Sequence, residues 1–329
     1  MHQKAAVILR FFRQQSGFVS GEQLSRELGI SRTAVWKHIS ALRGAGYRVE
    51  AVPSRGYRLL SSPDTLAAEE ISVQLNSGLI GTRLVNLATT TSTNFEAFRL
   101  AEEGAGEGTV VTAEEQSKGK GRLGRIWSSP PGANLYCSVI LRPRIKPFEA
   151  PQLTFLSAVA TARAIEQTTG LKPEIKWPND VLIDGKKVAG LLNEMSAETD
   201  GINDGINFVI LGIGVNLNMT ADQFPGDLRH PATSLLIEGG AKISRARFTA
   251  FLLNELDRLY AGFLDHGFVQ VRREWQERCN ANGREVVVSN HGRDDIRGLF
   301  AGIDGDGALL LRHPDGTIER ILSGDVRVL

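Results

Sequence analysis

Hydrophobic residues near the start of the chain follow helical spacing. They recur every three or four positions within residues 3–15, and again after Ser31, where an apolar stripe is formed by Val35, Ile39 and Leu42. Between these two segments, Leu24 and Leu28 indicate a short helix. Gly29 would end it, because glycine readily adopts the positive φ of a helix exit. The pattern predicts three helices, with Ser31 as the cap of the third.

The opposite face of the third helix is short, polar and cationic. It consists of Arg32, Thr33, Trp36, Lys37 and Ser40. Residues 47–59 predict two short strands around a turn at 53–56, which would form a hairpin wing with Arg55 and Arg58 at DNA phosphates. The segment therefore predicts a winged helix-turn-helix whose third helix enters the major groove. A three-helix packing domain without DNA binding is the alternative, and the exposed tryptophan disfavours it.

Strands and helices alternate beyond a polar joint at residues 63–82. Helical patterns run from Thr91 to about Gly104, over residues 150–167, and along a third apolar stripe formed by Phe248, Leu252, Leu256, Leu259 and Phe263. Asp184-Gly185 lies between two β-rich segments and predicts a hairpin. Residues 281–329 contain only short β segments and turns. The order indicates an α+β protein of several domains.

Composition agrees with several packed domains and shows a charge asymmetry. The chain has 329 residues, of which 42% are hydrophobic, with 38 Lys or Arg against 37 Asp or Glu. At roughly 100–200 residues per domain, two or three domains are expected. The first 62 residues contain ten Lys or Arg and three Glu, a net charge of +7, whereas the remaining 267 carry −6. A basic N-terminal segment is typical of proteins that bind a polyanion. From charge alone, a solvated charged face is an equally good interpretation.

Cysteine content and the absence of membrane signals suggest a compartment. Cys137 and Cys279 are the two cysteines, and neither belongs to a C-x-x-C motif, so a disulfide framework or a zinc site is not expected. Arg10 and Arg13 interrupt the apolar run that a signal peptide would need. No stretch reaches the roughly 18 apolar residues of a membrane span. We therefore expect a cytoplasmic protein with no membrane partner.

A predicted helix N-terminus carries hydroxyl groups. Thr93 and Glu96 have the spacing of a capping box, which would account for both residues. A helix N-terminus bearing the hydroxyls of Ser92 and Thr93 would also suit a polar group of a ligand.

A glycine-rich basic loop follows the next predicted strand. Residues 119–124 match G-x-G-x-x-G, but the segment 128–132 that follows cannot open the helix that a dinucleotide site requires. A P-loop is excluded because G-K-[ST] is absent. What remains is four cations within eight residues, namely Lys118, Lys120, Arg122 and Arg125. They predict either a cradle for an anionic ligand or a solvated loop that could bind nucleic acid. Neither G-x-S-x-G nor H-E-x-x-H occurs, which disfavours hydrolases and metalloenzymes.

Several motifs in a fixed order identify a family. After the helix-turn-helix come S-T-N at 92–94, G-K-G-R-L-G-R-x-W at 119–127, K-W-P-N-D at 176–180, K-V-A-G-L-L at 187–192 and G-I-G-V-N at 212–216. This order resembles that of the bifunctional biotin protein ligases that are also biotin operon repressors, over nearly the whole chain.

The resemblance implies a division of the chain into four segments. They are a winged helix-turn-helix at 1–62, a linker at 63–82, a mixed-sheet ligase domain of the biotin/lipoate ligase type at 83–280, and an SH3-like β-barrel at 281–329.

It also implies a two-step reaction and a regulatory role. Biotin and ATP, which is used with Mg²⁺, would form biotinyl-5′-AMP, and a lysine of a biotin carboxyl carrier protein would then accept the biotin. The adenylate would act as corepressor by favouring a homodimer that binds operator DNA of biotin synthesis genes. No structural metal is implied.

The site residues that the resemblance implies fall into overlapping groups. The catalytic pair would be Lys187 and Arg122. Biotin would be bound by Ser92, Thr93, Asn94, Gln116, Gly119, Lys120, Gly121, Arg122, Trp127, Lys187 and Gly190. The nucleotide would be bound by Arg122, Arg125, Trp127, Lys176, Asn179, Asp180, Lys187 and Asn216, with Asp180 also at Mg²⁺.

Two other functions compete with this one, and one residue departs from the family pattern. A biotin-sensing repressor without catalysis is one alternative, which Lys187 and Arg122 disfavour. A lipoate-type protein ligase is the other, which the basic head and the G-K-G-R-L-G-R loop disfavour. Lys120 stands where arginine is commoner, so it keeps the charge but lacks the bidentate fork of a guanidinium.

Overall fold

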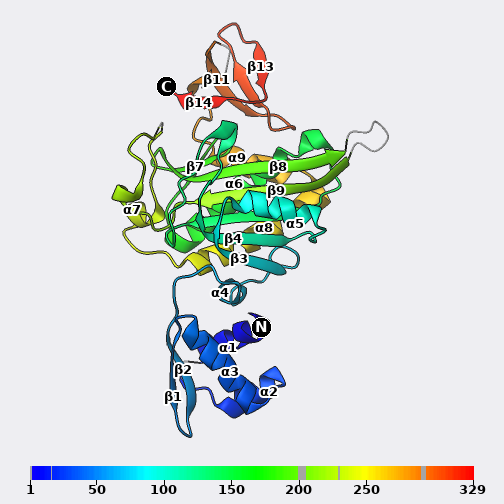
Figure 1. Ribbon diagram of the computed structural model, residues 1–329. Coiled ribbons are helices and arrows are strands. Elements are labelled where there is room, and N and C mark those ends of the chain that lie inside the picture. Colours follow the sequence, from blue (N-terminus) through cyan, green and yellow to red (C-terminus); the bar gives the residue numbers. More distant parts are fainter. Residues whose placement is uncertain (1, 16, 199–204, 229, 290–293) are drawn as a thin grey trace. The chain divides into compact units, whose positions relative to one another are not determined.

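The computed structural model describes residues 2–15, 17–198, 205–228, 230–289 and 294–329. The chain forms two compact units (Figure 1). Residues 1–75 together with 244–250 make up the first, called the head below, and residues 76–243 with 251–329 make up the second. Of the helices described, none has the length and apolar character needed to cross a membrane.

The head contains the three predicted helices and the predicted wing. Its elements are α1 (His2–Gln14), α2 (Gly21–Leu28), α3 (Arg32–Gly44), β1 (Arg48–Val52), β2 (Gly56–Ser61) and α4 (Ala68–Ser72). Ser31 caps α3 by accepting a hydrogen bond from the backbone N–H of Ala34 at 3.2 Å. Gly29 ends α2 with a φ of 59°, and both predictions are thereby confirmed.

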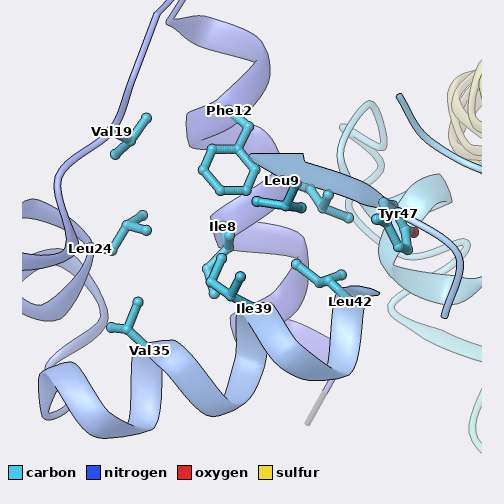
Figure 2. Close-up of a cluster of buried hydrophobic side chains, with 10 residues drawn as sticks. Ile8, Leu9, Phe12, Val19, Leu24, Val35, Ile39, Leu42 and Tyr47 are labelled. Atoms are coloured by element: carbon cyan, nitrogen blue, oxygen red, sulfur yellow. The ribbon is translucent and has the colours of Figure 1, made fainter. Parts of the chain in front are cut away.

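Apolar side chains from all three helices and the wing form the core of the head (Figure 2). The buried members are Ile8, Leu9, Phe12, Val19, Leu24, Val35, Ile39, Leu42, Tyr47 and Val49. They include the whole stripe predicted on α3. The spacing of apolar residues in the sequence therefore correctly predicts which face of α3 is buried. The outer residues Arg32, Thr33, Trp36, Lys37 and Ser40 are all exposed.

Backbone hydrogen bonds fasten the wing to the segment between α1 and α2. Val19 and Tyr57 exchange two N–H to C=O bonds of 2.8 and 2.9 Å. Gly56 has a φ of 104°, and a Cβ there would collide with the carbonyl of Val19. Glycine at this position therefore permits the close approach that makes the wing part of the folded head.

A buried arginine attaches the start of α8 (Arg245–His266) to the end of the head. Arg245 is 1% exposed, and its backbone N–H donates to Asp64 Oδ1 at 3.1 Å. Its guanidinium also donates to the carbonyl of Asp64. Its Nε lies 3.5 Å from Asp64 Oδ2, so the carbonyl and the carboxylate of one residue compensate the burial of the cation.

The second unit is built on a seven-stranded mixed sheet with the order β3-β4-β5-β9-β8-β7-β6. The strands are β3 (Arg83–Thr90), β4 (Thr109–Gln116), β5 (Leu135–Leu141), β6 (Glu174–Lys176), β7 (Asp180–Ile183), β8 (Lys186–Glu198) and β9 (Gly205–Val215). Strands β3 and β4 are parallel, whereas the other neighbours are antiparallel. The sheet is therefore mixed, as the resemblance implies.

Two helices pack on this sheet, α5 (Thr93–Glu102) and α6 (Gln152–Thr169), and α9 (Val269–Arg278) packs on α6. The second unit also contains the short α7 (Leu235–Gly239) and most of α8. Helix α5 packs on β4, β5 and β9, and α6 packs on β6 to β9. The apolar stripe predicted on the long helix from Phe248 to Phe263 is buried. The hairpin is also confirmed, since Asp184 and Gly185 both have positive φ, at 48° and 73°.

The C-terminal residues form a separate antiparallel sheet with the order β13-β12-β11-β10-β14. Its strands are β10 (Glu285–Ser289), β11 (Ile296–Ile303), β12 (Leu309–Arg312), β13 (Ile318–Ile321) and β14 (Asp325–Val328). It is joined to the rest of the second unit by specific contacts, such as the hydrogen bond of 3.1 Å from Trp177 Nε1 to the carbonyl of Gly307. The predicted small β domain is therefore present and packed within the second unit.

Candidate functional site

A cavity of about 760 Å³ opens in the second unit. The start of α5, the loop after β4, the β7–β8 hairpin and the end of β9 line it, and the C-terminal sheet contributes Asp325. The predicted ligand-binding residues that line it are Ser92, Thr93, Asn94, Gln116, Lys120, Gly121, Arg122, Arg125, Trp127, Lys176, Asn179, Asp180, Lys187, Gly190 and Asn216. Gly119 is not among the lining residues. It shapes the loop by accepting a hydrogen bond of 2.9 Å from the backbone N–H of Trp127.

Three polar side chains that line one end of the cavity form a hydrogen-bonded cluster with a fourth, Ser138, which is buried next to them and does not line the cavity. Gln116 Oε1 accepts from the backbone N–H of Thr93 at 2.8 Å and from its hydroxyl at 3.2 Å. The hydroxyl of Ser138 lies 2.8 Å from Thr93 Oγ1 and 2.7 Å from Asn94 Oδ1. We call Thr93, Asn94, Gln116 and Ser138 the polar cluster. Its bonds fix the orientation of groups that would otherwise rotate.

The capping box predicted for Thr93 and Glu96 is wrong. Ser92 is the residue that precedes the first turn of α5, and it makes no side-chain capping bond. Thr93 is already helical, and its side chain bonds to Gln116 instead. The tertiary partner from the next strand has replaced the local one.

Two glycines of β9 make room for this end of the cavity, and sequence reasoning did not single them out. A Cβ on Gly212 would collide with the carboxamide of Asn94, and one on Gly214 would lie 2.7 Å from Trp127 Nε1. Both belong to the G-I-G-V-N motif, whose alternation of glycine is the signal that could have revealed them. The indole nitrogen of Trp127 is buried without a hydrogen-bond acceptor among the described residues.

Lys187 lies inside the cavity. Its Nζ is 2.6 Å from Asp180 Oδ1 and 5.4 Å from the centroid of the Trp127 ring. Gly190 leaves space beside it, since a Cβ at that position would be 3.2 Å from Nζ. The hairpin has thus placed the ammonium group between one carboxylate and one aromatic face.

Two other cations of the cavity, Arg122 and Lys176, are partly desolvated. Arg122 Nη1 donates to Asn179 Oδ1 at 3.1 Å, and burial lowers the pKa of the Arg122 guanidinium. Burial likewise lowers the pKa of Lys176, although Asp180 and Asp325 act in the opposite direction. Five cations and three carboxylates line the cavity, so its walls carry a positive excess.

Two acidic residues that were not predicted from the sequence form ion pairs with the basic loop. Glu194 accepts a hydrogen bond of 2.8 Å from Asn94 Nδ2 and lies 3.6 Å from Lys120 Nζ. Asp325 pairs with Arg125, and this hydrogen bond raises the pKa of the arginine. The loop is therefore attached both to β8 and to the C-terminal sheet.

Asn216 connects the cavity to neighbouring loops. It is 4% exposed, donates to the carbonyl of Thr233 at 3.1 Å and accepts from Asn134 Nδ2 at 3.3 Å. These bonds keep its amide in one orientation at the cavity wall.

Within the described parts of the chain, no group of three or more histidine, cysteine, aspartate or glutamate side chains is placed to hold a metal ion. Asp180, the carboxylate predicted at Mg²⁺, is paired with Lys187 at 2.6 Å, and a single carboxylate of this kind fits a Mg²⁺ ion whose other ligands come from a substrate.

The sequence matches three family models in the order of its segments. Residues 4–58 match an HTH domain, residues 85–216 the biotin/lipoate A/B protein ligase family, and residues 282–329 the biotin protein ligase C terminal domain. These three matches span the head, the sheet that carries the cavity and the C-terminal sheet.

Whole-chain relatives and solved structures agree with these matches. The chain is 40% identical to the bifunctional ligase/repressor BirA of Bacillus subtilis, over 98% of this chain and 97% of that protein. It is 34% identical to BirA of Escherichia coli, over 94% and 92%. The biotin protein ligase of Aquifex aeolicus, solved in complex with biotin and ATP, has a TM-score of 0.64 at 29% identity and covers 75% of this chain and 99% of its own. The chain therefore belongs to the family of bifunctional biotin protein ligases, enzymes that carry a helix-turn-helix and also act as repressors.

Proposed function

We propose that the cavity joins biotin to ATP and passes the activated biotin to a carrier protein. The observation that carries this proposal is the joint presence of the polar cluster and of Lys187 with Arg122 in one cavity. The neutral ring system of biotin needs hydrogen-bonding groups, and its carboxylate needs cations where it meets a phosphate of ATP. The reaction therefore requires the two environments side by side. We further propose the segment boundaries 1–62, 63–82, 83–280 and 281–329 for the working domains.

Biotin lies at the polar cluster. Ser92, Thr93, Asn94 and Gln116 offer hydroxyl and amide groups to its ureido ring, and Trp127 forms part of the apolar wall. The carboxylate of biotin then points toward Lys187. Gly121 and Gly190 allow the backbone to approach the ligand closely, because they carry no side chain, whereas Gly119 acts through the shape of the loop.

The first step makes a mixed anhydride. A carboxylate oxygen of biotin attacks the α-phosphorus of ATP, the bond to the β-phosphate breaks, and pyrophosphate leaves. Lys187 and Arg122 offset the repulsion of the two anions and the charge that develops on phosphorus. In the second step the amine of a carrier lysine attacks the acyl carbon, the carbon–oxygen bond to AMP breaks, and the proton of the amine is lost to solvent or phosphate.

The nucleotide lies on the cationic side of the cavity. Lys176, Arg125 and Asn179 bind the phosphates and ribose, and Asn216 lies at the same ligand. Asp180, which is paired with Lys187 in the cavity, would help to hold Mg²⁺, and the metal would offset the charge of the phosphates. Lys120 ties the loop to Glu194, so the loop that covers the adenylate has a fixed base.

The head gives the bound adenylate a regulatory role. Bound adenylate favours a homodimer, and the dimer presents two copies of α3, with Arg32, Thr33, Trp36, Lys37 and Ser40, to a palindromic operator. Arg55 and Arg58 of each wing contact phosphates. Because ATP, the carrier and the operator are cytoplasmic, the protein works there.

Biotin-dependent ATP–pyrophosphate exchange tests the proposal. With the purified chain and Mg²⁺, we expect exchange with biotin and much less with lipoate. Exchange that is faster with lipoate would identify a lipoate-type ligase. Binding of biotin without any exchange would identify a sensor that lacks the chemistry.

Operator binding tests the regulatory half separately. Saturating biotin and ATP should raise both the sedimentation coefficient and the affinity for DNA. If neither changes although exchange is active, the protein is a ligase whose head is not controlled by the adenylate.

A further inference from the structure

Phe18 is an aromatic residue of the head that lies apart from its core. Among the side chains that the structure describes, neither the buried cluster of Figure 2 nor the hydrophobic residues packed against it include Phe18. Its ring contacts two arginines instead. The guanidinium carbon of Arg55 is 4.5 Å from the ring centroid, and that of Arg58 is 4.9 Å from it. Both distances lie within the roughly 6 Å of a cation–π contact.

The backbone next to Phe18 is bonded to β2, which carries Arg58 and directly follows Arg55. Val19 and Tyr57 exchange hydrogen bonds of 2.8 and 2.9 Å, and Gly56 between the arginines lacks the Cβ that would block this contact. Phe18 is therefore held at a fixed distance from the wing. Its place beside the arginines follows from the pairing of two segments that are far apart in sequence.

The charges around the ring are only partly compensated. Arg58 is 2.6 Å from Glu50 across the wing. Arg55 is exposed and has no carboxylate within 4.0 Å in the described part of the chain. The negative face of an aromatic ring lowers the repulsion between two nearby guanidinium groups, and it limits the rotamers of both. A pair of ordered cations with one countercharge fits a row of phosphates.

We propose that Phe18 is a positioning residue for DNA: it holds Arg55 and Arg58 over its ring, so that both meet the phosphate backbone with less side-chain entropy to lose. The inference rests on the DNA binding proposed for the head. Phe18 itself makes no base contact in this arrangement. Its effect on binding passes through the two arginines.

A double-mutant cycle in the full-length chain tests this. The probe is a fluorescent duplex that the wild-type chain selects from a randomised library, and affinity is measured by anisotropy with biotin, ATP and Mg²⁺ present. Phe18→Ala should weaken binding about tenfold. Phe18→Tyr keeps the ring and should restore the wild-type affinity. In a background of Arg55→Ala and Arg58→Ala, Phe18→Ala should cause no further loss.

Two controls separate positioning from support of the fold. Pyrophosphate exchange and Tm should be unchanged in Phe18→Ala, whereas Phe12→Ala in the buried core should lower Tm strongly. An equal loss of affinity with and without the arginines, an unchanged affinity of Phe18→Ala, or a large drop in its Tm would each overturn the inference. If the wild-type chain selects no duplex at all, the DNA binding of the head fails first, and that result is distinct from the other three.

Discussion

The two ends of the cavity hold their side chains in different ways. At the polar cluster, every group bonds to another protein group, and Thr93, Asn94 and Ser138 are nearly or fully buried. At the cationic end, Lys187, Arg122 and Lys176 are only partly buried, and the five cations that line the cavity outnumber its three carboxylates. The first end is already ordered by hydrogen bonds within the protein, whereas the second carries an excess of positive charge that the proposed anionic ligands would offset. Variants at the two ends should therefore fail in different ways.

The largest effect is expected at Lys187. In the proposed reaction the ammonium of Lys187 faces the biotin carboxylate and the α-phosphate. Lys187→Ala should therefore slow pyrophosphate exchange by about 10²–10³-fold, as loss of one charge-stabilising donor does elsewhere. The Tm should change little, since the side chain packs on no core cluster. The matched control is Lys186→Ala, which removes a neighbouring lysine whose Nζ is 3.0 Å from Glu238 and which does not line the cavity. A comparable loss of activity in the control would show that the hairpin, rather than the charge of Lys187, is responsible.

The next effect concerns retention of the adenylate. Arg122→Gly removes the bond to Asn179 and the partly buried cation of the loop, and it should release biotinyl-5′-AMP about a hundredfold faster, because a charge-assisted contact to phosphate is lost. Free adenylate would label lysines of an added bystander protein, which a biotin blot detects. Leu123→Gly, which alters an exposed side chain of the same loop, is the control. Wild-type retention of the adenylate by Arg122→Gly would contradict a covering role for the loop.

The polar end should respond to shape rather than to charge. Gly212→Ala places a methyl group against the Asn94 carboxamide, and overpacking of this kind costs about 1–3 kcal/mol. We expect the KM for biotin to rise about 10- to 100-fold, with a much smaller change in the KM for ATP. Gly262→Ala in α8 is the control, because its Cβ would meet nothing within 4 Å. Equal changes in both KM values would mean that the two ends are not independent.

The sequence is informative where a local pattern decides the structure. The stripe of Val35, Ile39 and Leu42 specifies the inner face of α3, and Asp184-Gly185 specifies the hairpin that carries Lys187. The motif order then identifies the family, and with it most of the residues that line the cavity.

The site residues that the sequence did not predict are brought to the cavity by the tertiary fold. Ser138 lies in a strand of otherwise apolar neighbours, and Asp325 is 200 positions from its partner Arg125. Neither has a sequence signal, because sheet order and domain packing bring each to the site. The capping box fails for the same reason, since Gln116 from β4 competes with the local partner of Thr93.

The smallest expected effect is a difference in how ligand affinity at the two ends depends on pH. The pKa of Lys176 is lowered by burial, so its ammonium is lost at a pH below the ordinary range of lysine. ATP phosphates bind the charged form, and therefore the affinity for a nonhydrolysable ATP analogue should fall as pH rises through this lowered pKa, by about tenfold at most for one charge-assisted contact. Lys176→Arg should keep its charge and remove this alkaline loss, because a guanidinium stays protonated there. Lys172→Arg, an exposed lysine outside the cavity, should retain the wild-type profile. Biotin affinity should stay flat across the same range, because the polar cluster contains no group that titrates there, and a parallel fall for biotin would contradict the division between the two ends.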